Sequence, residues 1–202
     1  MGVSPEIESD CWKIVLSGGG AHPTIEWLRI EASTLPIGPM ATYKFLTVWL
    51  LDAPIKSVWD TLVDYSTLPS WWQAVKYVKP LASDPANQEN RAWEMAWQTP
   101  LGYSLAFQAT FTRVEPPNIL ELNALGEVEG TGRWELQTTE EGTLAQYYWN
   151  VTTTKAWMNA LAIFIRPLMI WNHNAIMEQG GHAIADHLNT KLLKQEHYYL
   201  KD

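Results

Sequence analysis

Residues 52–72 read DAPIKSVWDTLVDYSTLPSWW, and the rest of the fold can be worked out from this stretch. Its apolar residues recur at the spacing of one helix face, in the series Ile55, Val58, Trp59, Leu62 and Val63. Asp52 and Pro54 stand just before the series as start signals, because proline is tolerated in the first helical turn. The pattern predicts an amphipathic helix, and the letters STLP predict a second, very short helix that carries Trp71 and Trp72.

Strands are predicted on both sides of this helical stretch. Residues 43–51 are rich in aromatic and β-branched side chains, and residues 103–115 alternate between apolar and polar types. Further short strands are predicted at 74–79, 91–99, 119–125, 133–138 and 143–153, with a glycine turn at 130–132. Repeated strands with short connections predict an antiparallel sheet that has one apolar and one solvated face.

A long helix over residues 157–193 is predicted to close the chain. Pro167 is expected to kink this helix, while Gly180 and Gly181 are expected to allow its close approach to the sheet. The apolar stripe of the helix runs along Met177, Gly181, Ile184 and Leu188. The order of elements is thus one strand, two small helices, six strands and a long helix.

Composition and charge narrow the class of protein. The chain of 202 residues is 47% hydrophobic and 18% charged, which is typical of one globular domain. Its net charge of −8 and the absence of basic runs argue against nucleic acid and anionic membranes as partners. The lone Cys11, the lack of a secretory signal and the shortness of the longest apolar stretch, residues 156–171, predict a soluble cytoplasmic protein without a membrane segment.

Residues 1–39 differ in character from the rest of the chain. Their stretch LSGGGAHPTIEWL contains a glycine run, but no helix with Lys and Ser/Thr follows it, so we interpret it as a turn and not as a phosphate loop. The regular pattern begins at Met40. We interpret residues 1–39 either as a peripheral N-terminal extension or as sequence upstream of the true start, and residues 40–202 as the folded domain.

The order of these elements and three motifs resemble the SRPBCC superfamily of START-like, polyketide cyclase/dehydrase and lipid-transport proteins. The motifs are APIKSVWDTLVDYSTLPSWW, EEGTLAQYYWNV and RPLMIWNHNAIMEQGGHAIADHL, and the resemblance spans roughly residues 42–193. It implies an α+β helix-grip fold, in which a curved antiparallel β-sheet wraps around a long C-terminal helix, with two short helices after the first strand. It also implies a cavity between sheet and helix.

The implied cavity suggests roles for the aromatic residues. We expect Trp59 to pack the first helix on the sheet, and Trp71 and Trp72 to lie near the cavity mouth, where such rings contact either a ligand or the core. The concave face is predicted to present Trp93, Trp97, Phe107, Phe111, Tyr147 and Trp149 opposite Asn174 and Met177 of the long helix.

Four polar residues are candidates for orienting a ligand. His173 lies at the edge of the helix stripe and Asn174 nearer its centre, so both could direct a polar group into the cavity. Arg113 ends the apolar face of its strand and could hold a carboxylate or an enolate-like oxygen, or extend into solvent instead. The hydroxyl of Tyr147 could donate to a ligand carbonyl.

Metal and catalytic constellations are not expected. His173 and His182 lie on opposite sides of one helix, so they cannot share a metal ion. Glu178, His182 and Asp186 share a face, which we interpret as solvated because it lies away from the apolar stripe. No nucleophile–base pair and no metal-ligand spacing is found, so no catalytic residue, metal or cofactor is assigned.

Three functions remain open from the sequence. The preferred one is non-covalent binding, transport or sequestration of a hydrophobic or aromatic small molecule such as a lipid or polyketide. The second is a polyketide cyclase or dehydratase in which His173, Arg113 or Tyr147 polarises the bound chain. The third is a module that binds a protein partner through its acidic surface or residues 1–39. The sequence leaves the oligomeric state open.

The interpretation of residues 1–39 as peripheral predicts the effect of a deletion. A chain that starts at Met40 is expected to melt within a few degrees of the full chain, because few apolar contacts would be lost. Thermal unfolding followed by circular dichroism measures this. A soluble deletion variant that melts far lower would show that the leader is an integral part of the fold.

Overall fold

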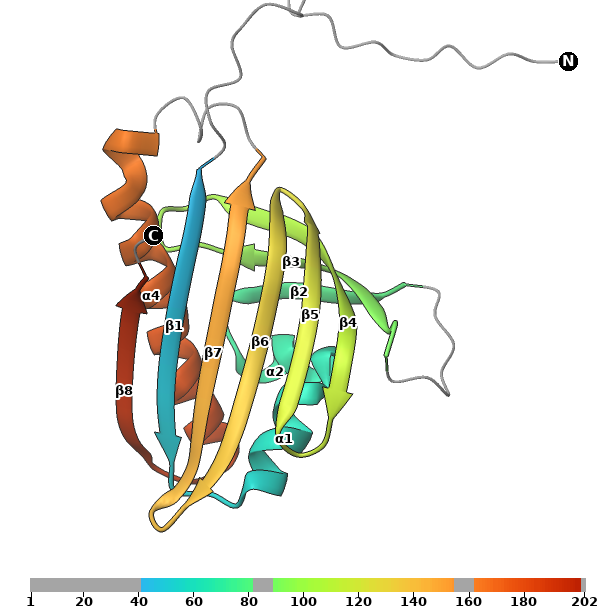
Figure 1. Ribbon diagram of the computed structural model, residues 1–202, viewed down its shortest axis with the longest axis vertical. Helices are drawn as coiled ribbons and strands as arrows, with labels where there is room; N and C mark the ends of the chain where they lie inside the picture. The colour runs from blue at the N-terminus through green and yellow to red at the C-terminus, as the bar shows by residue number, and fades with distance from the viewer. Residues whose placement is uncertain (1–40, 82–88, 155–161, 201–202) are drawn as a thin grey trace, which may run out of the picture. The chain divides into compact units, whose positions relative to one another are not determined.

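The computed structural model describes residues 41–81, 89–154 and 162–200, the first four residues of the last range as backbone only. The predicted N-terminal extension lies outside the described residues, so the boundary at Met40 stays a prediction. Within the described ranges the chain forms an α+β fold, in which a large antiparallel sheet carries its helices on one side (Figure 1).

The sheet has eight strands in the order β2-β3-β4-β5-β6-β7-β1-β8, and each neighbouring pair is antiparallel. The strands are β1 Thr42–Leu51, β2 Val75–Pro80, β3 Ala92–Gln98, β4 Ser104–Glu115, β5 Ile119–Gly126, β6 Val128–Thr139, β7 Gly142–Thr153 and β8 Leu192–Tyr199. The sheet is strongly curved, so that β2 and β3 cross behind β5 and β6 (Figure 1).

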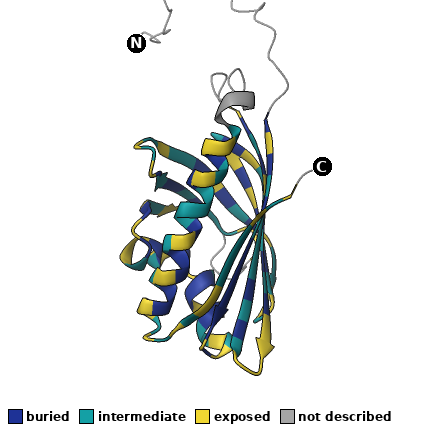
Figure 2. Ribbon diagram, turned by 90° about the vertical axis from the view of Figure 1, so that its left-hand side faces the viewer, coloured by how far each residue is buried: buried dark blue, intermediate teal, exposed yellow. Residues whose placement is uncertain are grey.

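The helices pack on the concave side of this sheet. They are α1 Ile55–Val63, a single 3₁₀ turn Tyr65–Thr67, α2 Leu68–Trp71 and the long α4 Ala162–His187. Their buried faces point toward the sheet, and α4 runs along its length (Figure 2). The predicted helix-grip architecture is confirmed, because the apolar faces of sheet and helices can be removed from water only by packing on each other.

The start of α1 differs from the prediction. Its N-cap is Pro54, and no side chain caps it. The backbone of Asp52 instead ties the end of β1 to the approach of β8, since its N–H donates to the carbonyl of Lys191 at 2.9 Å and its carbonyl accepts from the Thr190 hydroxyl. The side chain that serves as a cap is Asp64, which accepts from the Ser66 N–H at 3.2 Å and starts the 3₁₀ turn.

The predicted glycine turn at 130–132 is wrong, because both glycines lie within the long strand β6. Gly130 lies against the backbone of β7 at Asn150, whereas Gly132 makes room on the concave face. A Cβ at Gly132 would lie 2.6 Å from the Tyr147 hydroxyl oxygen and 3.0 Å from the ring of Trp149. Glycine at this position therefore lets two large rings lie flat against the neighbouring strand.

The predicted end of the long helix is also wrong. Helix α4 ends at His187, and Asn189 takes a left-handed conformation with φ 51°, which is a common way to end a helix. The N–H of Thr190 then bonds to the carbonyl of Ala185 at 2.9 Å. Residues 192–199 form an eighth strand that pairs with β1, where the sequence analysis extended the helix to residue 193.

Gly180 is the point at which α2 docks on α4. The indole Nε1 of Trp72 donates to the carbonyl of Ile176 at 3.3 Å, and the Trp72 ring occupies the space that a Cβ at Gly180 would need. The next glycine, Gly181, faces Trp49 and the flexible amide end of Gln195. The two glycines thus differ in what an added methyl group would displace.

This difference yields a prediction. Gly180→Ala is expected to lower the free energy of unfolding by about 1–3 kcal/mol, because the buried ring of Trp72 must shift. Gly181→Ala is expected to cost less or nothing, because the Gln195 amide can move and alanine gains about 1 kcal/mol over glycine in a helix. Urea unfolding of both variants measures the contrast, and equal losses would contradict it.

Candidate functional site

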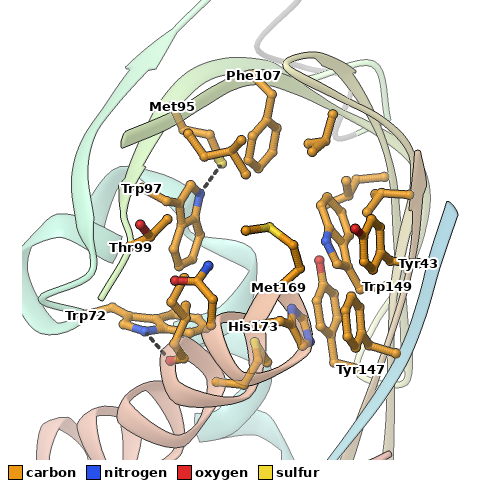
Figure 3. Close-up of a pocket in the computed structure, with 18 of the residues that line it drawn as sticks. Tyr43, Trp72, Met95, Trp97, Thr99, Phe107, Tyr147, Trp149, Met169 and His173 are labelled. Carbon is orange, nitrogen blue, oxygen red and sulfur yellow. Dashed lines mark hydrogen bonds between the residues drawn. The ribbon is translucent and has the colours of Figure 1, made fainter. Parts of the chain in front are cut away.

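A cavity of about 140 Å³ lies between the concave face of the sheet and α4 (Figure 3). Strands β1, β3, β4 and β7 supply most of its aromatic lining, and α4 closes it from the other side. The apolar residues that line it include Phe45, Leu62, Tyr65, Leu68, Trp72, Met95, Trp97, Leu105, Phe107, Leu122, Trp134, Trp149, Met169, Ile176 and Met177. Hydrophobic burial therefore dominates any binding here.

Seven of the predicted site residues line this cavity. They are Trp72, Trp97, Phe107, Tyr147, Trp149, His173 and Met177. Two of them are held by hydrogen bonds that fix their rings, since Trp97 Nε1 donates to the sulfur of Met95 at 3.2 Å and Trp72 Nε1 donates to α4 (Figure 3). A ligand would therefore meet rings that are already in place.

Trp93 and Phe111 do not line the cavity, although they share the concave face. Their ring centroids are 4.5 Å apart, and the ring of Tyr65 packs on both, at 5.2 Å from Trp93 and 4.9 Å from Phe111. These three rings fill the space beside the cavity as solid core. The expectation that Trp93 and Phe111 face a ligand is corrected, because the 3₁₀ turn inserts Tyr65 over them.

Trp71 is also absent from the lining. Its ring stacks on Trp72 at 5.5 Å and on His187 at 5.8 Å between centroids. It therefore supports the docking of α2 on α4 from behind Trp72. Of the two adjacent tryptophans, only Trp72 faces the cavity.

Arg113 lies on the outer face of the sheet, contrary to the expectation that it ends the cavity face. The pairing of β4 with β5 shifts register between Phe111 and Arg113, which is a β-bulge, and this reverses the side on which Arg113 stands. Its guanidinium donates to Glu115 at 2.8 Å and to Glu121 at 3.5 Å, with 41% of the side chain exposed. It cannot reach a ligand in the cavity.

Helix α4 buries the predicted apolar stripe, and of its three predicted site residues His173 and Met177 line the cavity whereas Asn174 does not. The cavity is lined by residues at i, i+3, i+4, i+7 and i+8, namely Met169, Asn172, His173, Ile176 and Met177. Asn174, two positions beyond Asn172, turns away from the lining. The predicted amide is thus the wrong asparagine, because the contact of Trp72 with Gly180 sets the rotation of the helix.

Three polar atoms in the lining are buried without a hydrogen-bond partner among the described residues. They are the hydroxyl oxygen of Tyr43, Oδ1 of Asn172 and Nε2 of His173. Such a buried atom costs about 1–3 kcal/mol unless a ligand or water satisfies it. Tyr43 is not among the predicted site residues. Its alternation with Phe45 and Trp49 in β1 places these side chains on one face of the strand, as the alternation in residues 103–115 does.

The ionisable groups of the lining are held in their neutral forms. Burial, reinforced by the nearby His197, lowers the pKa of His173 to about 3. The His173 ring is stacked on Phe45 with 3.9 Å between ring centroids. Burial also raises the pKa of Tyr147 well above its ordinary value. At neutral pH both side chains are therefore uncharged.

The described part of the chain contains no group of three or more His, Cys, Asp or Glu that could hold a metal ion. Glu178, His182 and Asp186, which share one helix face, are all exposed, in agreement with the predicted solvated face.

None of the described helices is both long and apolar enough to cross a membrane.

The curved sheet, the long helix and the apolar cavity between them define a helix-grip protein. A profile of the family described as "Polyketide cyclase / dehydrase and lipid transport" matches residues 44–188. The chain belongs to this family. Membership supports a role in hydrophobic-ligand binding or cyclase-like chemistry.

Solved structures with the same fold agree with this assignment. The di-domain ARO/CYC BexL from the BE-7585A biosynthetic pathway is 18% identical, with a TM-score of 0.61 over 74% of this chain and 51% of BexL. The Zhui aromatase/cyclase from Streptomyces sp. R1128 is 13% identical, with a TM-score of 0.58 over 74% of this chain and 94% of that one. A protein of unknown function from Staphylococcus aureus is 11% identical, with a TM-score of 0.54 over 75% of this chain and 98% of that one.

The chain spans about half the length of BexL and of a second di-domain ARO/CYC protein, StfQ from the steffimycin pathway. A search of curated proteins found no match. At these identities the structural likeness shows a shared fold.

The buried neutral histidine predicts a pH dependence of stability. Because the pKa of His173 is about 3 in the folded protein and 6.5 when free, the unfolded chain binds more protons between these values. The contribution of neutral His173 to the free energy of unfolding is therefore lost as the pH falls from 6.5 toward 3. Between pH 7 and pH 4.5, His173→Gln is expected to lose about 2 kcal/mol less stability than the wild type.

Urea unfolding at the two pH values measures this difference. His182→Gln, which changes an exposed histidine of the same helix, is the control and should keep the wild-type pH dependence. If the free energy of unfolding of His173→Gln depends on pH as steeply as that of the wild type, His173 takes up its proton in the folded protein and the prediction is wrong.

Proposed function

We propose that this protein binds a hydrophobic or aromatic small molecule, non-covalently, in the cavity between the sheet and α4, for transport or sequestration. The observation that carries the proposal is the cavity of about 140 Å³, whose described lining is mostly aromatic and aliphatic and contains no Asp, Glu, Lys or Arg. A preformed apolar cavity binds apolar molecules because their transfer from water is favourable and little has to be rearranged.

The volume supports a particular size of ligand. An engineered protein cavity of about 150 Å³ with apolar walls binds benzene, so the cavity here, at about 140 Å³, is close to the size that accepts a single six-membered ring. A larger ligand requires a lining side chain to move. Met169 projects into the space between Trp97 and Trp149 (Figure 3), and a methionine side chain has three rotatable bonds with which to move aside.

Cyclase-like chemistry is the second candidate, and the likeness to the ARO/CYC proteins favours it. Of the three residues that could polarise a substrate, Arg113 is on the outer face, while His173 and Tyr147 line the cavity. A histidine whose pKa is about 3 is a weak general base at neutral pH, and a tyrosine whose pKa is raised is a weak acid. These properties favour binding over catalysis.

Phe107→Ala tests the binding function. Phe107 lines the cavity beside Trp149, with 5.8 Å between ring centroids, so its truncation should enlarge the cavity and change the affinity for a neutral apolar dye such as Nile red. The free energy of unfolding should fall by at most about 3 kcal/mol, because part of the Phe107 ring faces the cavity and not neighbouring side chains.

Phe111→Ala is the matched control. This ring lies in the solid core against Tyr65 and Trp93, so its truncation should cost about 3–5 kcal/mol of stability without altering the affinity for the dye at the existing cavity. Tryptophan emission and melting temperature report on binding. If a panel of fatty acids, sterols and flat aromatic compounds changes neither, the proposed function is wrong.

A further inference from the structure

Three buried polar atoms of the lining have no hydrogen-bond partner in the part of the chain that the structure describes, and we call them the unpaired trio: the Tyr43 hydroxyl oxygen, Asn172 Oδ1 and His173 Nε2. Tyr43 and Asn172 are 3% and 6% exposed, so bulk water does not satisfy them. Tyr43 and His173 lie on the side of the cavity that also carries Tyr147 and Trp149, while Met95 and Phe107 lie across from them (Figure 3). The cavity is thus apolar over most of its lining and locally polar.

Each member of the trio offers a neutral hydrogen-bonding atom. The Tyr43 hydroxyl can donate or accept, Asn172 Oδ1 accepts, and the Nε2 of a neutral imidazole either donates or accepts according to the tautomer. A ligand hydroxyl could donate to Asn172, and a ligand carbonyl could accept from Tyr43. A hydrocarbon would leave all three atoms without a partner.

A charged ligand group has no counter-ion in this lining. None of the described lining residues is Asp, Glu, Lys or Arg. Arg166 adjoins the lining without belonging to it, since its guanidinium lies over the ring of Tyr43 at 5.3 Å and donates to the Tyr199 hydroxyl and to the Thr42 carbonyl. A carboxylate in the cavity would therefore lose its hydration without an ion-pair partner in contact.

We propose that the unpaired trio selects an uncharged ring compound that carries a hydroxyl or carbonyl oxygen, and that the cavity discriminates against carboxylates of the same shape. This inference rests on the proposed binding function and narrows its ligand class. It excludes fatty-acid anions as the preferred ligands and favours phenols and ring ketones. Asn172 and Tyr43 become residues that determine specificity.

Three ring compounds of nearly equal shape test the proposal: p-xylene, p-cresol and p-toluate, which carry a methyl, a hydroxyl and a carboxylate group at the same position. Calorimetry or ligand-observed NMR at pH 7 gives their dissociation constants. In a purely apolar cavity p-xylene would bind best, because the cresol hydroxyl is better hydrated. We expect p-cresol to bind at least as tightly as p-xylene, and p-toluate at least about 100-fold more weakly than p-cresol.

Two variants remove members of the trio while keeping the shape of the side chain. Tyr43→Phe keeps the ring that stacks on Phe45 and Arg166, and Asn172→Leu replaces the amide by an alkyl group of similar size. Each is expected to weaken p-cresol relative to p-xylene by about five- to ten-fold. Asn172→Leu should also raise the melting temperature, because an unsatisfied buried atom is removed.

Matched controls lie outside the cavity. Asn174→Leu changes the neighbouring asparagine that does not line it, and Tyr198→Phe changes an exposed tyrosine. Both variants should leave the ratio of the dissociation constants of p-cresol and p-xylene unchanged. The controls separate the loss of a hydrogen bond in the cavity from a general effect of the substitution on the fold.

The outcomes separate this inference from the proposed function. If p-xylene binds better than p-cresol in the wild type, or both variants leave the ratio unchanged, the selection by the trio is refuted while cavity binding stands. If p-toluate binds best, Arg166 recruits anions and the proposal is also wrong. If none of the three compounds binds, the inference is refuted, and the panel of fatty acids, sterols and flat aromatic compounds decides the proposed function separately.

Discussion

The contact between the Trp72 ring and Gly180 controls the architecture of the site. The indole occupies the space of a missing side chain on α4 and donates to the carbonyl of Ile176, one helical turn earlier. This contact joins the short helices that follow β1 to the long helix that precedes β8. Together with the bond from Gln195 Nε2 to the carbonyl of Met177, it constrains the rotation of α4 about its axis. In this orientation Asn172 and His173 line the cavity while Asn174 does not.

The curved sheet gathers aromatic rings on its concave face, but only some of them surround empty space. Where the 3₁₀ turn inserts Tyr65, the rings of Trp93 and Phe111 close into solid core. Along β6 and β7, Gly132 lets the side chains of Tyr147 and Trp149 lie close to the sheet, so that they line a cavity instead of filling it. Aromatic residues therefore form solid core at one end of the concave face and line the cavity at the other.

The interior of the cavity is polar at a few atoms and charged at none of its described residues. Burial keeps His173 neutral, and the bulge in β4 turns Arg113 to the outer face, where two glutamates neutralise it. Among the described lining residues the ionisable groups of His173 and Tyr147 are both uncharged at neutral pH. In the proposed function the polar atoms of the lining would orient a ligand whose affinity comes from its apolar body.

The sequence by itself determined the fold class, the order of the elements up to α4, and most of the aromatic wall. The resemblance of three motifs to a known superfamily implied the fold class. The order of the elements and the faces of the strands follow from local periodicity, because the period of the apolar residues distinguishes helix from strand and assigns each strand residue to a face. Seven of the predicted site residues line the cavity for this reason. The end of α4 also has a local signal, because Asn189 is a residue type that commonly follows a helix in the left-handed conformation. The predicted helix nevertheless continues past it to residue 193.

Only the tertiary structure decided which residues of the concave face meet a ligand. Periodicity gives the face of an element, but neither the register shift that turns Arg113 outward nor the partner that rotates α4 is encoded in a local pattern. The division between solid core at Phe111 and open cavity at Phe107 depends on whether Tyr65, from a distant segment, occupies the space above the ring. Empty space is a property of packing between segments, and the spacing of residues along one segment does not contain it.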